Sequence, residues 1–334
     1  TLFDHIQHDN LSDEILTTTN KSFNKEYFKS LKDVEISSKD TSKIQLVNFY
    51  KSGSKTYRLS LAYLSYNKGS INLKCLVEII VILNINHITF ESPLNVNTQN
   101  WKSIEVGNIT YYYEDTIDVN NARYFDQKNT MIATKLGYKP EKFNFYMCSN
   151  YQDVLKIMGY VYDSESNGIT RDGYGVVGNT IFSIENNEDF SHDLLHYYAA
   201  KVRENVKRNH AAEEGLAYYW GNAYYVDKNR NMVELTQLKD NLKEYLIQNQ
   251  NANLLDLFSK NTRNFSKLAP EFSLKSTIAG LICELIEKEK GIDGIKTLIK
   301  CGKGDDAFFE ITNQIVGINQ SNFESKVRYL IDKK

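Results

Sequence analysis

Two histidines spaced four residues apart, His192 and His196, are the side chains of this sequence best suited to metal chemistry. In a helix, residues i and i+4 lie on one face a turn apart, so both imidazoles could bind a single metal ion. The pair alone is a weak motif among six His, because two polar residues on a half-exposed helix show the same spacing. Glu214 favours the metal interpretation, since two His and one carboxylate with an open fourth position form the ligand set of a catalytic zinc site.

A helix must position the two histidines, and the residues around them favour one. Asn186 and Asn187 can cap its start, and Glu188 and Asp189 would place negative charge on its first turn. An apolar stripe at helical spacing would bury the helix beside its metal face: Leu195, Tyr198, Ala199 and Val202. Glu214 can begin a second helix that packs against the first.

His-x-x-x-His on one helix, followed by Glu-Gly-x-Ala on the next, resembles the gluzincin metallopeptidases, the group that includes thermolysin and aminopeptidase N. The resemblance implies that His192, His196 and Glu214 bind one zinc ion and that the protein hydrolyses peptide or protein substrates. The family carries a Glu directly after the first His as general base, whereas this sequence has Asp193. Aspartate is one methylene shorter, and a displacement of about 1 Å at a reacting group can cost about a hundredfold in rate.

Other polar side chains near the ligands could assist, each with a plainer alternative. His210 could hydrogen-bond a transition-state oxyanion, or lie in a solvated helix end with the charges of residues 203–208. Tyr218 shares the helical face of Glu214 and could polarise a scissile carbonyl, or pack in the core. Glu213 could support the site or lie on the surface.

The composition indicates a globular protein and argues against several other classes. The chain has 334 residues, 41% hydrophobic and 25% charged, which is typical of globular domains and sufficient for two of them. Its formal net charge of −2 and the lack of a basic stripe argue against nucleic acid as a partner. No apolar run is long enough to cross a membrane. The four Cys form no Cys-x-x-Cys pair, so neither a zinc knuckle nor a disulfide scaffold is expected.

The pattern predicts an α+β protein of two domains. Residues 1–106 would form a small domain with a helix at 24–34 and an antiparallel meander, of the cystatin or nuclear-transport-factor shape. Residues 93–108 are expected to include the linker. Residues 107–334 would form the gluzincin-like peptidase domain, with a mostly helical C-terminal portion. By analogy with that family, residues 180–183 would be an edge strand that receives the substrate backbone; an ordinary internal strand is the alternative.

The remaining elements follow from periodicity and from Gly, Pro and Asn punctuation. Strands are expected at residues 44–51, 56–66, 71–84, 87–91, 109–113, 143–147 and 179–184. Further helices are expected at residues 121–136, 151–158, 231–249, 274–290, 293–300, 305–316 and 322–332. Residues 167–178 are expected to form a loop.

Two further functional hypotheses stay open beside hydrolysis. The chain could be a zinc-binding but weak or inactive relative that acts as a binding module in the cell envelope, with the N-terminal domain as its protein-binding surface. It could also be a helical scaffold without metal. The resemblance further implies a bacterial protein that is exported to the periplasm or cell envelope. A start at Thr1 rather than Met agrees with a removed leader without establishing one.

Overall fold

The computed structural model describes residues 14–36, 41–67, 69–85, 87–166, 175–223 and 232–333. The described residues fall into two compact units. Unit 1 draws on Thr1–Ala122 and Lys142–Glu188, and unit 2 on Arg123–Glu141 and Asp189–Lys334. The fold is mixed α+β, as predicted, with an N-terminal antiparallel sheet and a mostly helical C-terminal part.

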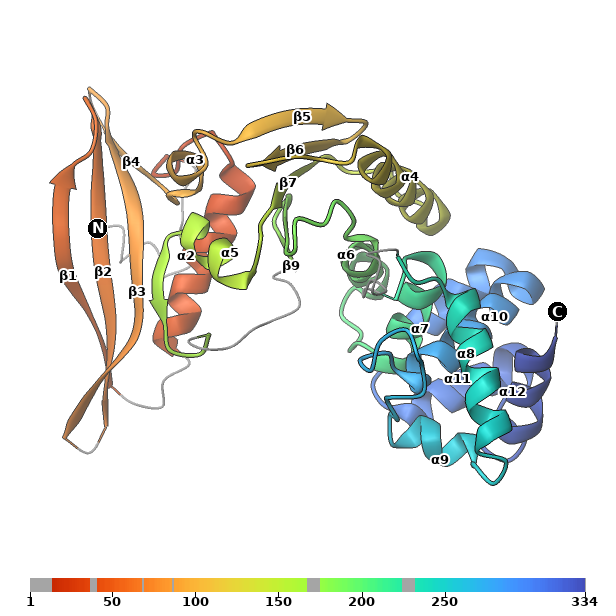
Figure 1. Cartoon of the computed structure of the whole chain (residues 1–334). Helices are drawn as coiled ribbons and strands as arrows, with labels where there is room; N and C mark the ends of the chain where they lie inside the picture. The colour runs from red at the N-terminus through yellow and green to blue at the C-terminus, as the bar shows by residue number, and fades with distance from the viewer. Residues whose placement is uncertain are drawn as a thin grey trace. The chain divides into compact units, whose positions relative to one another are not determined.

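The first sheet of unit 1 is the predicted antiparallel meander. Its strands pair in the order β1–β2–β3–β4, and β8 joins the same side of β3 as β4. The bounds are β1 Thr41–Lys51, β2 Thr56–Asn67, β3 Ser70–Leu83, β4 Ile88–Glu91 and β8 Tyr160–Asp163. Helix α2 (Lys21–Ile36) supplies aromatic side chains to the core beside this sheet (Figure 1), and Tyr27 donates a 2.8 Å hydrogen bond to the Glu78 carbonyl. The comparison with a cystatin or nuclear-transport-factor shape stays a prediction.

The second sheet of unit 1 has the order β5–β6–β7–β10–β9. Its strands are β5 Lys102–Val106, β6 Ile109–Tyr113, β7 Phe143–Met147, β10 Thr180–Ser183 and β9 Gly175–Val177. The β6–β7 and β7–β10 pairs are parallel and the outer two pairs are antiparallel. Helix α5 (Tyr151–Met158) follows β7, capped by Asn150 and ended by Gly159 in the left-handed region.

Two expectations for unit 1 are wrong. Residues 93–108 form α3 (Leu94–Asn97) and β5 rather than a linker, and Leu94 is fully buried. The polar residues that suggested a linker are tolerated because β5 pairs on one side only, with β6. The edge position implied by analogy for residues 180–183 is also wrong, and the alternative of an internal strand is confirmed, since β7 and β9 flank β10 and all four of its residues are buried.

The division into compact units differs from the predicted boundary after residue 106, which falls in the turn between β5 and β6. Strands after that point belong to unit 1 rather than to the helical part. Most of the predicted loop at residues 167–178 lies outside the described residues, and its end forms β9.

Unit 2 is helical and organised around α10. Its helices are α6 Ser191–Arg203, α7 His210–Trp220, α8 Leu235–Gln248, α9 Leu254–Ser259, α10 Leu274–Ile299, α11 Asp305–Val316, α12 Phe323–Asp332 and most of α4 Val119–Leu136. Helix α10 contacts α6, α7, α8, α9, α11 and α12. Its first half is mostly apolar and buried, and the helix breaks at Gly291, where φ is 63°, as the sequence predicted from that glycine. Within the described residues, none of the helices has the length and apolarity needed to cross a membrane.

Candidate metal centre

The two histidines and the glutamate predicted as ligands come together in unit 2. His192 and His196 project from α6 with ring centroids 5.0 Å apart, and Glu214 projects from α7. The Nε2 atoms of His192 and His196 each lie 3.3 Å from a Glu214 carboxylate oxygen. One ligand atom from each residue can be chosen so that all lie within 4.8 Å of one another. In the part of the chain that the structure describes, no other group of His, Cys, Asp and Glu side chains converges in this way.

These distances fit a zinc ion. Zinc bonds to His and carboxylate are about 2.0–2.1 Å long and near tetrahedral, which places neighbouring ligand atoms about 3.3 Å apart. Each His–Glu distance of 3.3 Å matches that separation, although His192 faces one oxygen of the Glu214 carboxylate and His196 the other. Two imidazoles and one carboxylate also suit zinc better than magnesium or calcium, which prefer oxygen ligands.

Two glycines bring the helices close enough to form the cluster. A Cβ on Gly221, just after α7, would lie 3.1 Å from the Cα of His192. A Cβ on Gly215, the residue after Glu214, would lie 2.5 Å from the Cβ of Ala279 on α10. The glycine of the Glu-Gly-x-Ala motif therefore lets α7 rest directly on the α10 backbone, which fixes the helix that carries Glu214.

Helix α6 begins later than the sequence predicted. Its first residue is Ser191 and the capping position is Phe190, so Asn186 and Asn187 do not cap it. Asp189 precedes the helix instead of lying on its first turn. The cause is a tertiary contact, because the buried Asp189 carboxylate accepts a hydrogen bond from the side chain of a residue that follows α7.

That residue is Asn222, which holds His192 in place. The Nδ1 of His192 lies 3.0 Å from the backbone oxygen of Asn222. A carbonyl only accepts hydrogen bonds, so Nδ1 carries a proton, and loss of the second proton would leave the lone pair on Nε2 for a metal. The Asn222 side-chain amide donates to Asp189 and, at 3.1 Å, to the Ser191 hydroxyl, which ties the loop after α7 to the start of α6.

Glu213 performs the corresponding role for His196. Its carboxylate is fully buried, and one oxygen lies 3.4 Å from the Nδ1 of His196. Arg203 and Arg208 compensate the buried charge, the Nε of Arg208 at 3.3 Å and that of Arg203 closer still. A carboxylate on the far nitrogen of a metal-binding His is a common supporting arrangement. Glu213 therefore supports the cluster and does not lie on the surface.

Arg208 also reaches the ligands themselves. Its Nη2 pairs with a carboxylate oxygen of Glu214 and lies 3.2 Å from the Nε2 of His196. The interpretation of residues 203–208 as a solvated helix end is therefore incomplete: Arg203 faces the buried Glu213 carboxylate, and Arg208, though partly exposed, pairs with Glu213 and Glu214. A metal bound to Glu214 would share that carboxylate with Arg208 or displace it.

The cluster shifts the ionisation of its members. Burial opposes ionisation of Glu214, but hydrogen bonds from His192 and His196 and their charge hold the pKa of its carboxyl far below the ordinary value. Burial also disfavours the charged form of His196, yet the carboxylates of Glu213 and Glu214 outweigh it and raise the pKa of that imidazole. The site thus strongly favours positive charge at its centre.

Helix α7 starts one turn earlier than predicted. It begins at His210 rather than near Glu214, because the Asn209 side chain caps it by accepting a 3.1 Å hydrogen bond from the Ala212 amide. The earlier start places His210 beside the cluster, its Nδ1 3.8 Å from a Glu214 oxygen. Burial is the main cause that lowers the pKa of His210, which keeps it neutral near pH 7.

Asp193 lies on the first turn of α6 and is half-buried, directly after His192. Among the described residues, no hydrogen bond or ion pair engages its carboxylate.

Tyr218 is buried with its ring centroid 5.9 Å from that of His192. Its hydroxyl accepts a 3.3 Å hydrogen bond from the Ser273 amide at the start of α10. Burial raises its pKa to about 12, so the group stays protonated. These contacts make Tyr218 part of the packing between α7 and α10, and its predicted role toward substrate stays a prediction.

No protein-family model matches the chain, and no curated protein shows significant similarity to it. The resemblance to gluzincins therefore rests on the spacing of His192, His196 and Glu214 in the sequence.

Proposed function

We propose that His192, His196 and Glu214 hold one zinc ion and that the protein is a zinc-dependent peptidase. The observation that carries the proposal is the orientation of the two imidazoles. Both Nε2 atoms face the Glu214 carboxylate at 3.3 Å, while both Nδ1 atoms are held from behind by the Asn222 carbonyl and the Glu213 carboxylate. Export to a bacterial cell envelope belongs to the same proposal and rests on the resemblance.

The chain's own residues would divide the remaining work. A zinc ion at this site would polarise a peptide carbonyl and activate water for attack. Asp193, with no partner among the described residues, would accept a proton and pass it to the leaving amine. His210, neutral and exposed over 62% of its side chain, would donate a hydrogen bond to the developing oxyanion.

A second function has support of its own. Arg208 contacts the Glu214 oxygen that faces His196, and Asp193 is shorter than the family's glutamate. Both features suit a zinc-binding relative with weak or no activity, used as a binding module.

Metal content of the purified protein tests the site. We expect about one zinc per chain in the wild type, loss of the zinc in His196→Ala, and its retention in His87→Ala. His87 is an exposed histidine just before β4, so the same substitution there controls for general effects. No zinc in the wild type after incubation with excess metal would refute both metal-dependent functions.

Hydrolysis of a broad peptide library then separates the two functions. Asp193→Glu should raise the rate if the geometry is right and the base is too short, whereas Asp193→Asn should abolish it. A zinc-loaded protein that cleaves no peptide in the wild type or in Asp193→Glu would support the binding module instead.

A further inference from the structure

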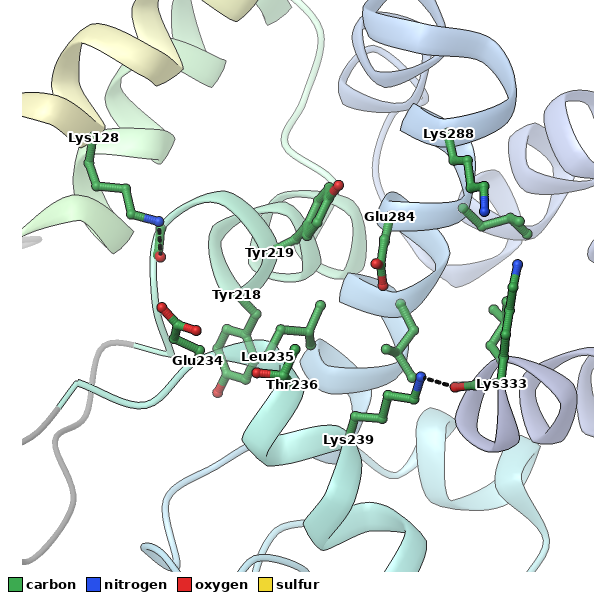
Figure 2. Close-up of a pocket in the computed structure, with 14 residues that line it drawn as sticks. Lys128, Tyr218, Tyr219, Glu234, Leu235, Thr236, Lys239, Glu284, Lys288 and Lys333 are labelled. Atoms are coloured by element: carbon green, nitrogen blue, oxygen red, sulfur yellow. Dashed lines mark hydrogen bonds between the residues drawn. The ribbon is translucent and has the colours of Figure 1, made fainter.

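A pocket of about 410 Å³ lies in unit 2, and the residues of the metal cluster do not line it. It is bounded by the end of α7, the start of α8, the middle of α10 and the end of the chain after α12 (Figure 2). Leucines give it an apolar floor: Leu235, Leu281, Leu285 and Leu330. The volume is in the range of small-molecule sites.

The rim of the pocket carries an acidic and a basic side chain, and neither is paired with another described residue. Glu284 and Lys288 lie one turn apart on α10, a spacing at which helical ion pairs form readily. Neither side chain has a hydrogen bond or an ion pair with another described residue. Both are exposed and line the pocket (Figure 2).

Two more lysines strengthen the positive side of the rim. Lys239 on α8 donates a 2.6 Å hydrogen bond to the backbone oxygen of Lys333, and an ammonium group has three donors, so it can bind a further acceptor. The Lys333 side chain also lines the pocket (Figure 2). Lysines on α8, on α10 and just after α12 therefore give the pocket lining several groups that could pair with an anion.

We propose that this pocket binds a short apolar peptide in its zwitterionic form. The peptide ammonium would pair with Glu284, the terminal carboxylate with Lys288 and Lys239, and apolar side chains would cover the leucine floor. One helical turn rises about 5.4 Å, and the charged ends of an extended dipeptide are separated by a similar distance.

Other classes of ligand fit less well. A neutral apolar molecule would bury the rim charges without partners, which is costly. A ligand with only an anionic group would leave Glu284 uncompensated, and a metal cation would meet several lysines. The proposal does not depend on the metal site, since none of its contacts involves His192, His196 or Glu214.

Saturation-transfer NMR on the full chain tests the proposal with the dipeptide Leu-Leu, its N-acetyl form and its C-terminal amide. The free dipeptide should bind saturably, and blocking either end should weaken binding about tenfold or more, because each block removes a charge-assisted hydrogen bond. Equal binding of the three ligands, or no saturable binding of the free dipeptide at millimolar concentration, would overturn the proposal. The same spectra report any cleavage, so peptide binding and hydrolysis are read separately.

Two exposed substitutions assign the contacts. Glu284→Gln should remove the preference for the free amine over the N-acetyl form, and Lys288→Ala should reduce the preference for the free carboxylate over the amide. Glu289→Gln and Lys290→Ala, on exposed positions of α10 that do not line the pocket, should leave both preferences unchanged. If the rim variants behave like these controls, the assignment is wrong. Zinc content measured on the same samples shows whether the metal proposal stands or fails on its own.

Discussion

Glu213→Gln tests whether the buried carboxylate positions a metal ligand or serves only its arginine partners. The substitution keeps the shape of the side chain but removes the charge that faces His196, Arg203 and Arg208. Breaking a buried ion pair costs about 3–5 kcal/mol of unfolding free energy. We expect the low end, about 3 kcal/mol, because Arg203 is 17% exposed and Arg208 40% exposed, so water can solvate both.

The expected effect of Glu213→Gln on zinc affinity is a separate quantity, and in free energy it is smaller than the loss of stability. Loss of a group that supports a metal-binding His typically lowers metal affinity 10- to 100-fold. At a zinc concentration of about 100 times the wild-type Kd, zinc stabilises the wild type by about 2.7 kcal/mol. The same zinc would stabilise Glu213→Gln by only about 1.4 to 0.4 kcal/mol.

Denaturant unfolding with and without zinc measures both quantities, and competition with a chromophoric chelator gives the Kd directly. Glu289→Gln, the same change at an exposed position of α10, should alter neither. A Glu213→Gln protein that is destabilised but binds zinc with wild-type affinity would refute the positioning role. It would leave Glu213 as a partner of the two arginines alone.

Three further predictions concern the same cluster. Gly221→Ala would put a Cβ 3.1 Å from the Cα of His192; it should destabilise the protein by about 1–3 kcal/mol and weaken zinc binding, as melting and chelator competition would show. Arg208→Gln removes a cation that shares the Glu214 carboxylate; it should tighten zinc binding about tenfold, and unchanged or weaker binding would show that Arg208 does not compete. Zinc affinity should fall as the pH is lowered through the raised pKa of His196, because a proton on that imidazole competes with the metal. For an ordinary His the fall would begin at lower pH, so titrations of Kd between about pH 8 and about pH 6 test the direction.

Local patterns in the sequence predicted most elements of the fold. Strand β7 and helices α5 and α11 begin and end where periodicity and Gly or Asn punctuation placed them. The spacing of His192, His196 and Glu214 predicted a cluster that the structure brings together. In each case the signal lies within a few residues along the chain, so tertiary structure was not needed to detect it.

The supporting residues depend on contacts between distant segments. Asn222 reaches Asp189 and His192 across a span of about thirty residues, and nothing in its neighbours marks it. Arg208 follows a charged run that usually means solvent, and only the approach of α7 to α6 turns it toward Glu214. The sequence left the position of β10 open between the edge and the interior of its sheet for a similar reason, because the neighbouring β9 comes from a short glycine-containing segment without a strand pattern.

The contact between Gly215 and α10 packs the helix that carries Glu214 directly against a helix that lines the pocket. Glu214 is carried by a helix that has no space to slide, since a Cβ on Gly215 would already meet Ala279 at 2.5 Å. Glu284 and Lys288 stand further along that same α10. If a ligand in the pocket shifts α10 against α7 and thereby changes the affinity of Glu214 for a metal, thermodynamic linkage requires that the metal change the affinity for that ligand by the same factor.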